Sequence, residues 1–296
     1  MTAGIVAELR AAGCVFAEKE AAVLAASAAD PGELAALVAR RVAGVPLEHV
    51  VGWAEFCGRR IVVADGVFVP RHRTEFLVEL ATGLAASAAA GRGAPPVVVD
   101  LCCGSGALGA VVAARLGAPG GVVAGGGVPP ARPPAVPPVV LHAADVDAAA
   151  VRCARHNIEP VGGQVHEGDL FAALPGELRG RVDVLIANAP YVPTEEIALM
   201  PPEAREYEPL VALDGGADGL DVLRRVIAGA GAWLAPGGHL LIETSVRQAP
   251  ALAAIAENHG LVERLEHSED HEATVLIATR PVASPGAGPA TAARRT

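Results

Sequence analysis

A series of apolar runs that end in polar side chains constrains the fold of this chain more than any other feature. Four successive runs, at 96–101, 139–145, 164–169 and 182–188, carry at or beside their ends Asp100, Asp145, Asp169 and Asn188. Two further apolar runs lie at 239–244 and 273–279, and helical patterns separate most of the six. Near-continuous apolar strands that alternate with helices are typical of a parallel sheet covered on both faces. We therefore predict an α/β fold whose polar strand ends meet at one edge of the sheet.

The first run is followed by a turn of small residues, "DLCCGSGALG", and then by a helical pattern. Small residues let a ligand approach the backbone, and the N-terminus of a helix offers free N–H groups. This arrangement is typical of the cofactor turn of a Rossmann-like unit, although it is not the G-x-G-x-x-G signature of dinucleotide sites. We expect Asp100 and Cys102 of this turn to lie at a cofactor.

The next two strand ends predict a nucleoside site. Asp145 ends the second run, where a carboxylate is suited to accept hydrogen bonds from ribose hydroxyls. Asp169 ends the third run beside apolar Leu170 and Phe171, which suits the amino group and ring of adenine. The interval from Asp100 to Asp145 exceeds the usual ~20 residues of such units. A Gly/Pro-rich insertion at 117–138, which we expect to be flexible, accounts for the excess.

The fourth run ends in "NAPY", and this end predicts a pocket for a planar NH2 group. The side-chain carbonyl of Asn188 can accept one hydrogen bond from such a group, and the main-chain carbonyl of Ala189 can accept the other. Pro190 stiffens the turn, and Tyr191 offers a ring face. This arrangement suits methyl transfer from S-adenosylmethionine to nitrogen, in which the protein mainly positions the acceptor.

"NAPY" resembles the "NPPY" signature of methyltransferases that act on planar amino groups. The stretch "GWAEFCGRRIVVADGVFVPRHRTEFLVE" resembles the hairpin linker of the HemK/PrmC family, whose segment usually ends "PRPETE". The resemblance covers roughly 45–280 and implies a class I methyltransferase that modifies the "GGQ" glutamine of class 1 peptide-chain release factors. It implies that Asn188 and the main chain at Ala189 and Pro190 hold the glutamine amide. It places at the cofactor Gly104, Gly106, Asp145 and Asp169, and near the substrate Arg71, Thr74 and Glu75.

The chain departs from this family pattern at four positions. Ala189 stands in place of the first Pro of "NPPY", Cys102 in place of a usual Gly, and His72 and Arg73 in place of the Pro and Glu of "PRPETE". These departures leave open an acceptor on another protein or a small-molecule amide. A DNA adenine methyltransferase and a non-catalytic nucleoside-binding module are the remaining alternatives.

Composition bears on compartment and partners. The net charge of −10 disfavours a protein that coats nucleic acid, because phosphate binding needs a basic surface. The five cysteines are odd in number and form no C-x-x-C pair, which suits a reducing cytosol. His267 and His271 lie in an acidic stretch that we expect to be a solvated turn, so we predict no metal site. We also predict no membrane helix and a cytoplasmic monomer.

The domain organisation follows from where the patterns change. Residues 1–48 show helical periodicity and are predicted to form a small domain that docks the substrate. Short β-like runs with Gly turns predict a hairpin linker at 49–75, and the methyltransferase domain is predicted at 76–282. The remainder, 283–296, has the composition of a disordered tail.

Overall fold

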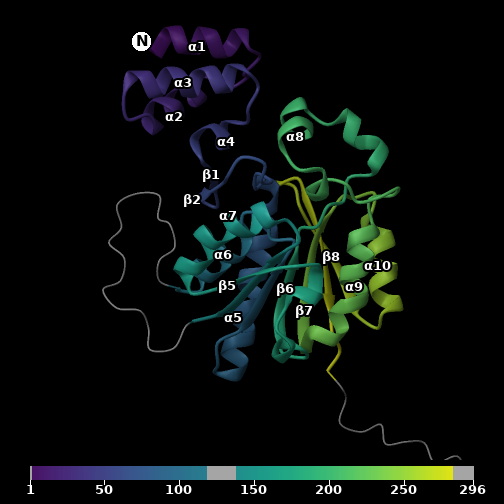
Figure 1. Ribbon diagram of the computed structural model, residues 1–296. Helices are drawn as coiled ribbons and strands as arrows, with labels where there is room; N and C mark the ends of the chain where they lie inside the picture. Colours follow the sequence, from purple (N-terminus) through teal and green to yellow (C-terminus); the bar gives the residue numbers. More distant parts are fainter. Residues whose placement is uncertain (1, 119–137, 283–296) are drawn as a thin grey trace, which may run out of the picture.

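The computed structural model describes residues 2–118 and 138–282 (Figure 1). The predicted insertion at 117–138 lies almost wholly outside the described residues, and the predicted tail at 283–296 lies wholly outside them. The centre of the larger domain is a seven-stranded sheet with the strand order β5-β4-β3-β6-β7-β9-β8. Its strands are β3 (Val97–Leu101), β4 (Val140–Asp145), β5 (Gln164–Glu167), β6 (Val182–Ala187), β7 (Leu234–Thr244), β8 (Val262–Ser268) and β9 (Ala273–Thr279). This arrangement confirms the predicted α/β, Rossmann-like fold.

The sheet is parallel from β5 to β7, and its last two pairings are antiparallel. β9 inserts between β7 and β8, so the prediction of a wholly parallel sheet was wrong at this end. β8 also corrects the expectation of a solvated turn around His267, which lies within this strand. Its acidic side chains concealed a strand because an edge strand has solvent beside it and tolerates charge.

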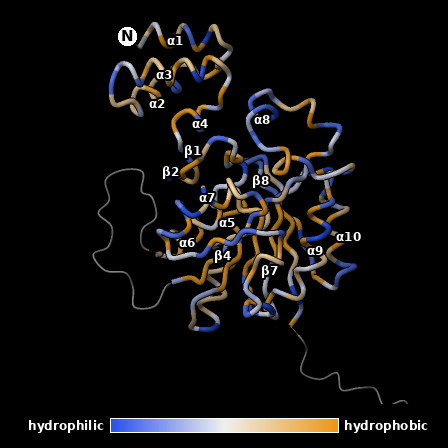
Figure 2. The backbone as a smooth tube through the Cα atoms, in the orientation of Figure 1, coloured by the Kyte–Doolittle hydropathy of each residue, from blue (hydrophilic) through white to orange (hydrophobic). Residues whose placement is uncertain are grey.

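Helices cover both faces of the sheet. One apolar core joins the sheet to α5 (Glu75–Arg92), α6 (Ala107–Arg115) and α7 (Ala148–Ile158), and another joins it to α9 (Asp221–Trp233) and α10 (Ala249–Asn258). Figure 2 shows the apolar strands at the centre and a hydrophilic α8. Successive residues of a strand point to opposite faces. Because Ala187 and Ile242 pack toward α9 and α10, the next residues, Asn188 and Glu243, fall on the side of α5.

The N-terminal part is a separate helical bundle with its own apolar core. It contains α1 (Thr2–Ala11), α2 (Ala17–Ser27), α3 (Pro31–Val42) and α4 (Leu47–Val51). A hairpin of β1 (Trp53–Phe56) and β2 (Arg59–Val62) follows, and its turn has positive φ at Cys57 and Gly58 (52° and 69°). The side chain of Asn157 on α7 bonds both the N–H and the carbonyl of Val62, which fastens the hairpin to the larger domain.

A segment between β6 and α9 crosses the carboxyl edge of the sheet, and we call residues 194–213 the cap. It contains η5 (Thr194–Leu199), α8 (Pro202–Tyr207) and η6 (Leu210–Ala212), and α8 lies above the sheet edge in Figure 1. Arg41 of the bundle contacts Glu203 of the cap at 2.7 Å, and Arg71 contacts the buried Glu208 at 2.6 Å. The cap is therefore attached to both the bundle and the linker. Within the described residues, no helix is long and apolar enough to cross a lipid bilayer.

Candidate active site

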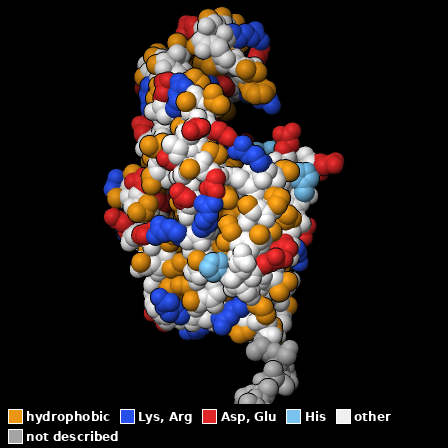
Figure 3. Space-filling view, turned by 90° about the vertical axis from the view of Figure 1, so that its right-hand side faces the viewer, with side chains coloured by type: hydrophobic (Ala, Val, Ile, Leu, Met, Phe, Trp, Pro, Cys, Tyr) orange, Lys and Arg blue, Asp and Glu red, His pale blue; other side chains and the backbone are white. Residues whose placement is uncertain are grey.

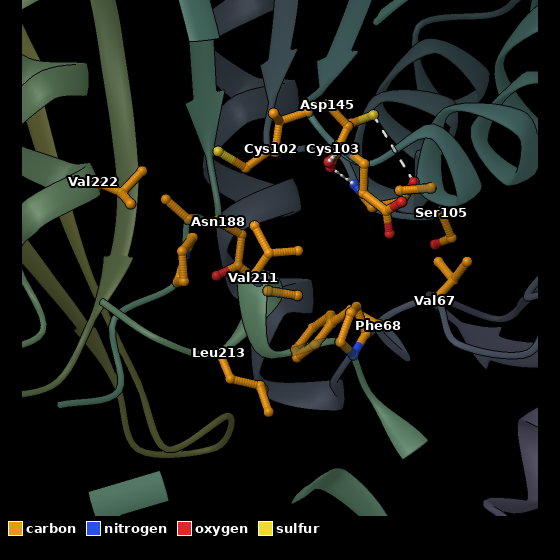
Figure 4. Close-up of a pocket in the computed structure, with 18 of the residues that line it drawn as sticks. Val67, Phe68, Cys102, Cys103, Ser105, Asp145, Asn188, Val211, Leu213 and Val222 are labelled. Atoms are coloured by element: carbon orange, nitrogen blue, oxygen red, sulfur yellow. Dashed lines mark hydrogen bonds between the residues drawn. The ribbon is translucent and has the colours of Figure 1, made fainter. Parts of the chain in front are cut away.

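A cavity of about 520 Å³ opens at the carboxyl edge of the sheet, where ligands bind in open α/β folds. Its walls come from the turns after β3, β4, β5 and β6, from the linker and from the cap (Figure 4). The volume is within the ~300–1,000 Å³ typical of small-ligand pockets. We call its two ends the cofactor half, lined by residues within 102–108, 144–150, 168–170 and 222–225, and the acceptor half, lined by residues within 67–73, 188–192 and 200–213.

The turn after β3 lines the cofactor half and needs glycine at two positions for different reasons. Gly104 has a φ of 54°, and a Cβ added there would meet nothing within 4 Å, so its backbone borders open space. Gly106, contrary to our expectation, does not line the cavity: its φ is 75°, and a Cβ there would lie 2.8 Å from Cγ1 of Ile158, so it packs the turn against α7. Cys102 lines the same half with a φ of 55°, a region that costs a non-glycine residue about 1–2 kcal/mol. The backbone of this turn at Gly104 therefore faces the open space of the cavity.

Asp145 lies beside this turn and braces it. One carboxylate oxygen accepts from the Gly104 N–H at 2.8 Å and the other from the Asp147 N–H at 3.0 Å. Burial raises the pKa of Asp145 above its ordinary value. Each carboxylate oxygen has a further lone pair, and the residue lines the cavity, so Asp145 can also accept bonds from a ligand.

Of the three residues predicted to lie beside adenine, two line the cavity and one does not. Asp169 and Leu170 line the cavity, and Asp169 pairs with Arg225 at 2.5 Å. Phe171 does not line it, contrary to our expectation. Its ring stacks on Trp233 at a centroid distance of 5.7 Å and packs against Gly229 of α9. The backbone turns sharply at Leu170, where φ is 46°, and Phe171 lies in the core beneath α9.

Asp100 also lies elsewhere than expected. It is buried beneath the turn and does not line the cavity. Its carboxylate accepts from the Gly109 N–H at 2.9 Å, and burial raises its pKa to about 7. Because Leu101, at the strand end, packs toward α9 and α10, Asp100 points under α6. Its role is to hold the start of α6 rather than to touch the cofactor.

The acceptor half contains the whole predicted "NAPY" group. Asn188, Ala189, Pro190 and Tyr191 all line the cavity, next to the turn that carries Cys102 and Gly104. The side-chain N–H of Asn188 donates to Oγ1 of the buried Thr74 at 3.5 Å. This weak bond orients the amide so that its carbonyl oxygen is available to another donor. The strand end thus presents a hydrogen-bond acceptor toward the cofactor half of the cavity.

The loop after Asn188 is held by its main chain. The side-chain N–H2 of Gln248 donates to the carbonyls of Tyr191 and Asp218, each at 3.0 Å. The N–H of Val192 donates to the Leu213 carbonyl at 3.1 Å, which ties the loop to the cap. The loop therefore has a fixed position relative to the sheet, the cap and the segment before α9.

Gly219 makes this arrangement testable. A Cβ there would lie 2.3 Å from the Tyr191 carbonyl oxygen, and φ is 76°. We expect Gly219→Ala to displace the loop and to reduce methyl transfer strongly. Gly237→Ala is the matched control, since its φ is 79° and its nearest neighbour lies at 3.4 Å. Both changes carry the left-handed backbone cost of about 1–2 kcal/mol, but only the first displaces the loop. Equal turnover in the two variants would contradict this role of Gly219.

Of the three linker residues predicted to lie near the substrate, only Arg71 lines the cavity. Arg71 lines the cavity, but one of its nitrogens contacts both oxygens of Glu208, at 2.7 and 2.6 Å. Thr74 reaches the site through Asn188. Glu75 does not line the cavity, and its carboxylate accepts from the N–H of Cys57 at the hairpin tip at 3.0 Å. Glu75 therefore fixes the hairpin and does not face a substrate.

Sequence reasoning missed three residues at this end, namely Phe68, Arg73 and Glu243. Arg73 lines the cavity, and its Nε donates to the buried Glu243 at 3.1 Å. The Tyr191 hydroxyl donates to the same oxygen of Glu243 at 2.9 Å. A signal for Glu243 was present, because it lies one residue before the end of the apolar run at 239–244, as Asp100 does in the run at 96–101. Phe68 of the linker also lines the cavity. The centre of its ring lies 4.9 Å from Cζ of Arg71.

Asp145→Ala is expected to weaken S-adenosylmethionine binding by about 1–3 kcal/mol, the cost of losing bonds to a charged group. In the wild-type protein, the raised pKa of Asp145 makes this binding depend on pH. The affinity for S-adenosylmethionine should be full above that pKa, where the carboxylate is ionised, and should fall as the pH drops through it. Asp145→Asn keeps an oxygen for the Gly104 N–H and so separates bracing of the turn from ligand binding. Calorimetry at neutral and acidic pH measures both effects, and wild-type affinity in Asp145→Ala would place the ribose elsewhere.

Comparison with curated proteins identifies close relatives by sequence. The release factor glutamine methyltransferase of Geobacter sulfurreducens is 37% identical over 78% of this chain and 72% of its own length. That of Gloeobacter violaceus is 37% identical over 75% of this chain and 70% of its own. A 4-amino-L-phenylalanine/4-methylamino-L-phenylalanine methyltransferase of Streptomyces pristinaespiralis is 35% identical over 74% of this chain and 67% of its own. No family model matches the chain.

Among solved structures, a methyltransferase from Pyrococcus furiosus is similar in fold. It has a TM-score of 0.51 and 15% sequence identity, and the match covers 76% of this chain and 91% of that one. This likeness supports the fold assignment. In the part of the chain that the structure describes, no three or more His, Cys, Asp or Glu side chains gather as a metal site.

Proposed function

This chain belongs to the release factor glutamine methyltransferase family, and we propose that it transfers a methyl group from S-adenosylmethionine to a glutamine side-chain amide. The acceptor is the glutamine of the "GGQ" loop of a class 1 peptide-chain release factor. The observation that carries this proposal is the single cavity that joins the braced turn at Gly104 to the carbonyl-rich end of β6 at Asn188.

The cofactor half has the features that S-adenosylmethionine requires. Asp145 faces it with free lone pairs for ribose hydroxyls, and the backbone at Gly104 leaves open space beside it. Leu170 and Val146 supply apolar surface for a base, and Asp169 stands at the rim. When bound, the cofactor supplies a methyl group already activated on a sulfonium.

The acceptor half positions the nitrogen. The two N–H bonds of the amide donate to the Asn188 side-chain oxygen and to a main-chain carbonyl at Ala189 or Pro190. An amide nitrogen is a weak nucleophile, so holding it in line with the methyl group supplies most of what the protein must contribute. In the transfer, the nitrogen gains a carbon bond as the sulfur–carbon bond breaks, and one N–H proton leaves to solvent.

Tyr191 forms a wall of this half and is not a proton acceptor. Burial and the neighbouring Glu243 raise the pKa of its hydroxyl well above the ordinary value. The neutral hydroxyl donates to Glu243, which fixes the ring against the cavity. Tyr191 therefore supplies no base at the acceptor end.

A second candidate acceptor is the amino group of a free aromatic amino acid. The relative from Streptomyces pristinaespiralis, named for 4-amino-L-phenylalanine, shares 35% identity with this chain and favours this candidate. DNA adenine is disfavoured, because basic and acidic side chains alternate on the face shown in Figure 3 and form no continuous basic surface there.

The remaining proposals concern the partner. We propose that the bundle at 1–48 and the linker at 49–75 dock the release factor onto the domain at 76–282. Arg41, which is buried and paired with both Glu20 and Glu203, supports this because it joins the bundle to the cap over the acceptor half. A monomer acting on a translation factor in the cytoplasm, without stable nucleic-acid binding, fits this role.

The test is to offer three acceptors with S-adenosylmethionine: an intact release factor, 4-amino-L-phenylalanine and duplex DNA. Peptide mass spectrometry should find one added methyl group, on the "GGQ" glutamine. Methylation of the amino acid alone would move the acceptor assignment to the second candidate. Methylation of adenine would contradict the glutamine assignment.

A further inference from the structure

The two halves of the cavity differ in charge. Three carboxylates line the cofactor half, namely those of Asp145, Asp147 and Asp169. The acceptor half is lined by Arg71 and Arg73 and, within the described residues, by no Asp or Glu. Acidic groups suit the cationic methyl donor. Arg71 and Arg73 stand in front of the buried carboxylates of Glu208 and Glu243, and an uncharged amide needs no cation there.

The arginines that line the cavity differ in how many of their N–H donors are already used in ion pairs. Arg71 contacts both oxygens of Glu208, and Arg225 contacts Asp169. Arg73 contacts Glu243 through Nε, and its side chain is 50% exposed. A guanidinium carries five N–H donors, so four of the five lie outside this bond. Arg73 is thus the cation best able to bind a ligand group at the acceptor end.

Glu243 holds Arg73 in place. Its side chain is 3% exposed, and one oxygen accepts from both Arg73 and the Tyr191 hydroxyl. Its other oxygen is buried and has no hydrogen-bond partner among the described residues. The guanidinium lies 5.9 Å from the centre of the Tyr191 ring. The buried charge and the ring together fix the guanidinium at the cavity wall instead of leaving it mobile.

We propose that Arg73 is a specificity-determining residue that binds a carboxylate of the acceptor close to its planar nitrogen, and that Glu243 is the positioning residue for Arg73. The proposal rests on the acceptor site assigned above. The carboxylate belongs either to the α-carboxyl group of a free amino acid or chain end, or to an acidic side chain next to the methylated residue. A guanidinium binds such a group through two parallel N–H bonds, which a neutral carboxamide cannot match in charge.

The experiment compares matched ligands by NMR titration of the full chain saturated with S-adenosylhomocysteine. One pair is acetyl-Gly-Gly-Gln with a free α-carboxylate and the same peptide as an α-carboxamide. The other pair is acetyl-Gly-Gly-Gln-Asp-amide and acetyl-Gly-Gly-Gln-Asn-amide. In at least one pair the carboxylate member should bind at least ~10-fold more tightly, as expected for a charge-assisted bond. The pair that responds identifies the source of the carboxylate.

Variants assign this preference to Arg73. Arg73→Gln should bring the ratio of the affinities for the carboxylate and carboxamide ligands close to one. Arg73→Lys should retain part of the preference for the carboxylate. Glu243→Gln should lower the ratio, and none of the three should change the affinity for S-adenosylhomocysteine. Arg155→Gln is the matched control, because it removes the same charge from a residue that does not line the cavity.

Two results would overturn the proposal. One is equal or undetectable binding of both members in both pairs to the wild-type chain. The other is a preference that survives in Arg73→Gln. Neither measurement requires turnover, so a failure of release factor methylation would appear separately, in the mass-spectrometric assay.

Discussion

Asn188→Ala should lower methyl transfer by ~10²-fold or more while S-adenosylmethionine still binds, because misplacing a reacting group by about 1 Å costs this much. Asn188 directly follows β6 in the cavity wall, and its side-chain oxygen is available to the acceptor N–H. The proposed cofactor contacts come from Asp145 and the turn at Gly104, which are bonded to each other and not to Asn188. Rate measurements under saturating cofactor, with calorimetry for cofactor affinity, separate the two effects.

Three further variants show whether the carboxamide itself is responsible. Asn188→Asp should also be poor, since a carboxylate beside the sulfonium can rotate or bind water instead of holding the amide. Thr74→Val removes the bond to Asn188 without removing the oxygen that faces the acceptor, so its effect should be smaller. Ala189→Pro should be tolerated, because the main-chain carbonyl remains. Full turnover in Asn188→Ala would refute the acceptor role.

The strand ends that carry the site could be predicted because the sequence changes there from buried apolar residues to polar ones. Four apolar runs carried Asp or Asn at or beside their ends, and three of those residues, Asp145, Asp169 and Asn188, line one cavity. The prediction for the fourth residue, Asp100, was wrong, because this residue lies one position away from the strand end. Side chains alternate along a strand, and Asp100 lies one residue before the end, so it points beneath α6 instead of into the cavity.

Phe171 and Glu243 show two further limits. The apolar pair Leu170 and Phe171 looks equivalent in the sequence, but the backbone reverses at Leu170 and sends the second ring into the core. Composition does not reveal such a reversal at a non-glycine residue. Glu243 lies one residue before the end of an apolar run, as Asp100 does, and it went unrecognised because its partner Arg73 lies 170 positions earlier in the chain.

Arg73 appeared in the sequence only as a departure from a linker motif. Its importance depends on β7 lying beside β6, which brings Glu243 next to the loop that carries Tyr191. Long-range pairing of this kind follows from strand order, and strand order was not derivable from the periodicity. The parallel arrangement of the central strands was predictable, whereas the antiparallel insertion of β9 was not.

The second large effect concerns the substrate. A release factor whose "GGQ" glutamine is replaced by glutamate should be methylated ~10⁴-fold more slowly or not at all, because sites built for hydrogen-bond donors reject analogues that lack them by such factors. A carboxylate cannot donate, so the Asn188 oxygen and a main-chain carbonyl would remain unpaired in a wall where Ala189 is 1% exposed.

The intact factor should also outperform a short "GGQ" peptide if the bundle contributes docking. Arg41→Gln tests this route, because Arg41 joins the bundle to Glu203 of the cap without lining the cavity. It should reduce kcat/KM for the intact factor and leave that for the peptide nearly unchanged. Peptide mass spectrometry with isotopically labelled methyl groups measures all of these rates. Equal rates for peptide and factor would remove the docking role, and methylation of the glutamate version at the wild-type rate would show that the cavity does not select a primary amide.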